Sequence, residues 1–134
     1  MRKLISQKKA INIMIALLTV VLVFHTLVLT GVIPYAIVWA GKISTTAEMR
    51  KWEAISMGVN SFAILIFLFK AGYIKNKIPV KTLNAFIWLL VVLFSLNTIG
   101  NLFAQSQFEL YFFTLLTFIM AVLCLRIVID KKLK

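Results

Sequence analysis

The sequence predicts an all-α integral membrane protein in which four spanning helices form a single bundle. Of its 134 residues 62% are hydrophobic and only 14% are charged, and the mean hydropathy is +1.00. A soluble domain is typically about 45–50% apolar and about 25% charged. The charged residues are also clustered, and long uncharged stretches lie between the clusters. The length of these stretches is close to the roughly 20 residues that a helix needs to cross a bilayer. The length predicts one domain covering residues 1–134.

The first two helices are expected at about residues 11–33 and 46–73. The first apolar run is far longer than the roughly 7–15 residues of a signal-peptide core, so it predicts an uncleaved spanning helix. Pro34 is expected to end it, because proline has no N–H to donate within a helix. Thr45 and Glu48 have the spacing of a capping box, which predicts the start of the second helix.

The third and fourth helices are expected at about residues 82–103 and 107–129. A short basic loop with Pro79 separates the third helix from the second. Ser106 and Glu109 form a second capping-box pattern before the last apolar run.

The distribution of basic residues predicts the orientation. The N-terminal segment, residues 70–81 and the C-terminal end hold twelve of the fifteen Lys and Arg residues, and the other three are Lys42, Arg50 and Lys51. Since basic residues stay on the cytoplasmic side, both termini are predicted to be cytoplasmic, with the chain in the cell membrane. The net charge of +11 then fits anionic lipid at the cytoplasmic face rather than nucleic acid.

Polar side chains concentrate in the outer half of all four predicted helices. Because polar groups inside a membrane face the bundle interior or a wet cavity, we predict a small outward-opening ligand-binding cavity. Its lining would be His25, Asn60, Asn97 and Asn101, with Glu53 near its mouth.

A structural interpretation competes with this one. Asn, Ser and Thr side chains often serve only as hydrogen bonds between membrane helices. On that interpretation His25 bonds Asn60 or Asn101, and Glu53 pairs with Arg50 on its own helix.

The segment after the first helix combines a helix breaker, aromatic residues and a charge. Tyr35, Trp39 and Lys42, together with Trp52, form either an interfacial anchor or a lid over the cavity. The run from Pro34 to Lys42 resembles an I-P-Y-x-x-V-W-G-G-K/R pattern in small four-helix membrane proteins of bacteria, with Ala40 in place of the usual glycine. That family has no assigned activity, so the resemblance implies a bacterial membrane and no chemistry.

No catalytic or metal-binding pattern stands out, and no cofactor is expected. The single cysteine, Cys124, allows no intramolecular disulfide. We therefore expect a non-enzymatic accessory, scaffold or ligand-sensing protein, as a homo-oligomer or with a partner membrane protein. One alternative is a small oligomeric transporter that uses His25; another is an enzyme acting on a lipid-like substrate, with His25 as acid or base and Glu53 assisting.

Overall fold

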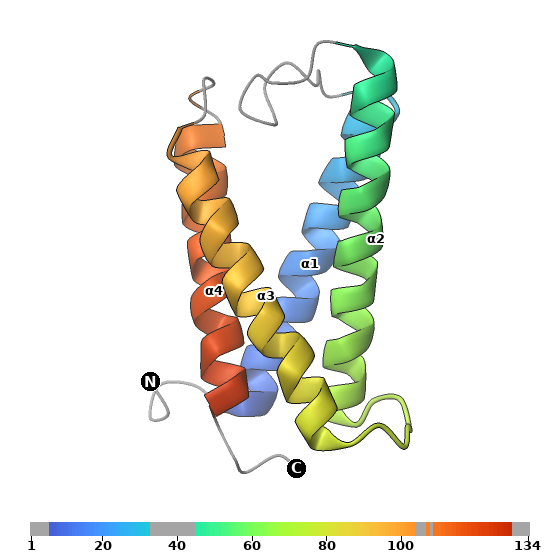
Figure 1. Ribbon diagram of the computed structural model, residues 1–134, viewed down its shortest axis with the longest axis vertical. Coiled ribbons are helices and arrows are strands. Elements are labelled where there is room, and N and C mark those ends of the chain that lie inside the picture. Colours follow the sequence, from blue (N-terminus) through green and yellow to red (C-terminus); the bar gives the residue numbers. More distant parts are fainter. Residues whose placement is uncertain (1–5, 33–44, 104–106, 108, 130–134) are drawn as a thin grey trace.

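The protein is a bundle of four antiparallel helices (Figure 1). The structure, a computed structural model, describes residues 6–32, 45–103, 107 and 109–129. Within these residues it contains α1 (Gln7–Leu29), α2 (Thr46–Ala71), α3 (Val80–Asn101) and α4 (Thr114–Ile129), with a short π-helix, η3 (Glu109–Phe113), leading into α4. No strand occurs in the described residues, and the predicted all-α class is confirmed.

The four helices form two hairpins. α1 packs most closely on α2, and α3 packs most closely on α4, whereas α2 and α3 touch much less. The start of α1, the loop 72–79 and the end of α4 lie together at the bottom of Figure 1, which we call the basic end. The end of α1, the start of α2 and the end of α3 lie at the opposite, far end, where the hairpins diverge.

The ends of the first helix differ from the prediction. α1 begins at Gln7, because the Ser6 hydroxyl accepts a hydrogen bond from the backbone N–H of Lys9 at 3.2 Å and caps the helix. It ends at Leu29, and Gly31 follows with a φ of +87°, a left-handed conformation that glycine adopts without a steric penalty. The prediction that Pro34 ends the helix was wrong, because the glycine three residues earlier already does so.

The other helix boundaries lie close to the predicted ones. The Thr45 hydroxyl accepts from the backbone N–H of Glu48 at 3.1 Å, so the predicted cap of α2 is confirmed. α2 ends before Gly72, whose φ is +83°. α3 starts two residues earlier than expected, directly after Pro79. The predicted second capping box lies outside the described residues, since Ser106 is not among them and the Glu109 side chain is not described.

The main apolar cluster occupies the half of the bundle nearer the basic end. Its members closest to the far end are Val21, Ala63, Phe94 and Met120, one from each helix. Polar contacts also tie this end together: the Gln7 side-chain amide donates to a backbone carbonyl of α4 at 2.7 Å. Nearer the far end, the buried side chains of the described helices include Glu53, Asn60 and Thr117.

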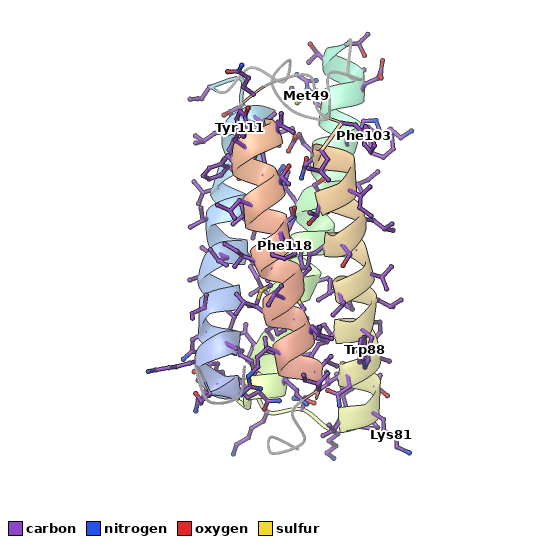
Figure 2. All side chains as sticks on the ribbon, turned by 90° about the vertical axis from the view of Figure 1, so that its left-hand side faces the viewer. Met49, Lys81, Trp88, Phe103, Tyr111 and Phe118 are labelled. Carbon is purple, nitrogen blue, oxygen red and sulfur yellow. The ribbon has the colours of Figure 1, made fainter. Side chains whose placement is uncertain are left out.

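The helix exteriors are suited to lipid. All four spans are long and apolar enough to cross a membrane, and large side chains such as Leu89 and Phe118 are exposed on them. Figure 2 shows Tyr111 near the far end and Lys81 at the basic end. The chain is therefore a multi-pass membrane protein, since the bilayer is the solvent that such surfaces require.

One lysine near the end of α2 is buried. Lys70 is only 6% exposed, and its ammonium group donates to the side-chain oxygen of Asn84 on α3 at 2.8 Å. This contact links α2 to α3 at the basic end.

Candidate functional site

A cavity of about 460 Å³ lies between the two hairpins, in the half of the bundle nearer the far end. Each helix contributes to its wall, and Val21, Phe94 and Met120 belong both to this wall and to the apolar core. The cavity therefore adjoins the end of the apolar core that is closer to the far end of the bundle. Its volume is within the range of about 300–1,000 Å³ that is usual for small-molecule sites.

The predicted polar residues meet at this cavity. His25 from α1, Asn60 from α2, and Asn97 and Asn101 from α3 all line it. The four side chains that were assigned a similar depth from sequence thus line one cavity. Glu53 is not part of the wall; it lies behind His25 and is completely buried.

The contact between His25 and Glu53 joins α1 to α2. The His25 Nδ1 atom and the Glu53 Oε2 atom are 2.5 Å apart, and the exposed fractions of the two side chains are 15% and 0%. A buried carboxylate needs hydrogen-bonding partners, because an unpaired charge in an apolar setting is very costly. The predicted bonding of His25 to Asn60 or Asn101 was wrong, and so was the pairing of Glu53 with Arg50. Sequence spacing does not reveal which faces of two helices meet.

The contact leaves one side of the imidazole available. Nδ1 is engaged by Glu53, whereas Nε2 has no hydrogen-bond partner in the described part of the chain. A carboxylate that holds one ring nitrogen fixes the orientation of the ring, and the other nitrogen can then interact with a bound molecule.

The three asparagines use little of their hydrogen-bonding capacity on the residues that the structure describes. The Asn60 amide donates to the backbone carbonyl of Ser56 in the preceding turn at 2.7 Å. Among the described residues the Asn101 amide reaches the Thr117 hydroxyl, at 3.5 Å. Asn97 forms no hydrogen bond with any residue that the structure describes. An amide has two donor hydrogens and one acceptor oxygen, so most of this capacity is available to a bound molecule.

Comparisons of the chain with protein-family models, with curated proteins and with solved structures found no match.

The four residues predicted as a lid or anchor are only partly described. Tyr35, Trp39 and Lys42 lie outside the described residues. Trp52 lines the cavity from α2 and is 40% exposed, so it stands at the rim of the site.

Two features of the wall were not predicted. Phe24 and Phe113 close the side between α1 and α4, with ring centroids 4.8 Å apart in an edge-to-face arrangement. Phe113 ends the π-helical turn η3, and a π-turn shifts the side chains that follow it around the helix axis. Gly100 on α3 also lines the cavity, and a Cβ atom added there would meet no atom within 4 Å.

The described residues bring no three His, Cys, Asp or Glu side chains close enough together to hold a metal ion. Cys124 is completely buried and packs in the apolar core.

Proposed function

We propose that this protein binds a small ligand within the membrane, in the cavity between its two hairpins, and acts as an accessory or sensing component rather than as an enzyme. One observation carries the proposal. Polar groups from the helices converge on a preformed cavity of about 460 Å³ while much of their hydrogen-bonding capacity stays unused inside the described part of the chain.

A purely structural role would leave a different pattern. Polar side chains that only hold helices together bond one another across the helix interface, as Thr98 and Thr117 do with their hydroxyl oxygens 2.9 Å apart. Within the described residues Asn97 and the Nε2 atom of His25 form no such bond, although both belong to helices that are long and apolar enough to cross a membrane, where an unsatisfied polar group would be costly. A ligand or water in the cavity would satisfy them.

The proposal includes the orientation predicted from the basic residues. The basic end would face the cytoplasm and the cavity would lie in the outer leaflet half. At the basic end a second hollow, of about 670 Å³, is lined by Lys70, Lys75 and Lys77. Such a surface suits the phosphate groups of anionic cytoplasmic lipid.

The direct test is native mass spectrometry of the protein purified from its own membranes in mild detergent. A bound small molecule is expected on the wild type and should be absent from Gly100→Leu, because Gly100 lines the cavity and the new side chain would occupy part of the ligand's space. The matched control is Gly58→Leu, because Gly58 is also helical and open, yet it does not line the cavity. The proposal fails if no molecule co-purifies with the wild type, or if the two variants retain it equally.

The His25–Glu53 contact favours a proton-linked transporter as the second candidate, because ionisable pairs inside membranes often form proton relays. Proteoliposomes that contain a pH-sensitive dye would show ligand-driven proton movement, and the His25→Leu/Glu53→Leu double variant would abolish it. Ligand binding without proton movement would support the accessory function, and release of a chemically altered ligand would support an enzyme.

A further inference from the structure

We propose that the ligand is an uncharged membrane amphiphile with a hydroxyl or carbonyl head group, held with its apolar chain leaving the cavity between α2 and α3. This inference rests on the proposed function and adds the chemical class of the ligand and its route. Three independent features of the cavity support it: its open side, its lack of a net charge to match an ionic group, and its available hydrogen-bonding groups.

The open side of the cavity lies between α2 and α3. Ile55 and Val59 on α2 line the cavity and are 48% and 38% exposed, and Leu96 on α3 lines it and is 60% exposed. The opposite side is closed by the contact between Phe24 and Phe113. Because the exposed edges are apolar and belong to lipid-facing helices, a chain that leaves between them would pass directly into the bilayer.

The wall offers no matching charge to an ionic head group. Among the described residues that line the cavity there is no Lys, Arg, Asp or Glu, and the one ionisable side chain is His25. Any positive charge on His25 lies against the Glu53 carboxylate, 2.5 Å from its Nδ1 atom. A phosphate or carboxylate bound here would lose its hydration without gaining a cation of its own.

The available polar groups suit a neutral head. The Nε2 atom of His25 and the amides of Asn97 and Asn101 supply both donors and acceptors. Hydroxyl and carbonyl oxygens bond such groups without any need for a counter-charge. Most of the remaining wall, which includes Val21, Leu93 and Met120, is apolar and matches the first part of a hydrocarbon chain; Ser56, Asn60 and Thr117 are its other polar members.

Trp52 at the rim provides the readout. In a Trp39→Phe/Trp88→Phe background in nanodiscs, its fluorescence is measured while a monoacylglycerol with a brominated chain is added; bromine quenches tryptophan on contact. We expect saturable quenching that disappears in Gly100→Leu and persists in Gly58→Leu. Asn97→Ala, which removes about one hydrogen bond to the head group, should weaken the apparent affinity about fivefold.

Two tryptophan substitutions on α3 test whether the apolar chain of the ligand leaves between α2 and α3. A tryptophan introduced by Leu96→Trp, with the three native tryptophans replaced by Phe, should be quenched saturably by the same probe. The matched Leu89→Trp, at an equally exposed position outside the cavity, should show only quenching proportional to the bilayer concentration of the probe. Equal behaviour at the two positions would contradict exit between α2 and α3.

Unlabelled lipids that displace the brominated probe distinguish two classes of neutral amphiphile. Displacement by monoacylglycerol alone indicates that the ligand is an acylglycerol, and displacement by a polyprenol indicates an isoprenoid alcohol. Saturable quenching by brominated phosphatidylglycerol instead of the neutral probe would overturn the inference about the head group. If no amphiphile saturates, yet mass spectrometry finds a molecule lost only from Gly100→Leu, this inference fails and the proposed function stands. If neither experiment detects a bound molecule, both fail.

Discussion

The contact between His25 and Glu53 holds α1 against α2 beyond the main apolar cluster, so its removal should weaken the fold measurably. Glu53 is completely buried, and the two side chains are 2.5 Å apart. A hydrogen bond to a charged group contributes about 1.5–3 kcal/mol, whereas neutral hydrogen bonds between membrane helices average about 0.6 kcal/mol.

A double-mutant cycle isolates this energy. The wild type, His25→Leu, Glu53→Leu and the double variant are unfolded at equilibrium in mixed micelles by increasing fractions of dodecyl sulfate. We expect a coupling energy of about 1.5–3 kcal/mol. His25→Leu alone should cost about 3 kcal/mol or more, since it removes this partner of a buried carboxylate. The double variant should be closer in stability to the wild type than His25→Leu is.

The neutral pair of Thr98 and Thr117, with its oxygens 2.9 Å apart, is the matched control. Replacing both threonines by valine in a second cycle should give a coupling energy near 0.6 kcal/mol. A His25–Glu53 coupling energy no larger than this value would refute the conclusion that the pair holds α1 against α2.

Two further predictions concern the cavity glycine and the orientation. Gly100→Leu and Gly58→Leu should each leave the free energy of unfolding unchanged or raise it by up to about 1 kcal/mol. Both sites are open, and glycine is a poor helix former. A loss of stability confined to Gly100→Leu would show that the cavity has no room for the larger side chain. In a variant without the native cysteine, cysteines placed at Lys42 and Gln105 should react with a membrane-impermeant maleimide on intact cells, and a cysteine at Asn76 should not. The reverse labelling pattern would place the cavity in the inner leaflet half.

The number of helices and the level of the site could be predicted from sequence, because both depend on position along each helix. Hydropathy alone separates four spans, and the alternation of their direction assigns a depth to every polar residue. His25 and Asn97 are more than seventy positions apart in the chain, yet they share a depth and therefore line the same cavity. This part of the prediction needed no knowledge of how the helices pack.

The partners within the site could not be predicted, because they depend on the rotation of each helix about its axis. The pairing of His25 with Glu53 rather than with an asparagine follows from which faces of α1 and α2 meet. The π-turn that carries Phe113 into contact with Phe24 directly precedes α4 and sets the rotation at which that helix begins, and helical periodicity gives no signal for it. The opening between α2 and α3 likewise comes from how the two hairpins diverge.

The end of α1 illustrates a competition between two local signals. Both Gly31 and Pro34 can stop a helix, and the first one along the chain prevailed, since Gly31 adopts the left-handed conformation that closes the last turn. The residues that follow include Tyr35 and Trp39, and their assignment as an interfacial anchor or a lid stays a prediction.

An experimental structure of the protein in its native lipids, from crystals grown in a lipidic mesophase, would test the central claim most directly. The account predicts elongated non-protein density in the cavity, with a polar end within hydrogen-bonding distance of the Nε2 atom of His25 and a tail passing between α2 and α3. A collapsed cavity, in which His25, Asn97 and Asn101 bond one another directly across a dry seam, would contradict it.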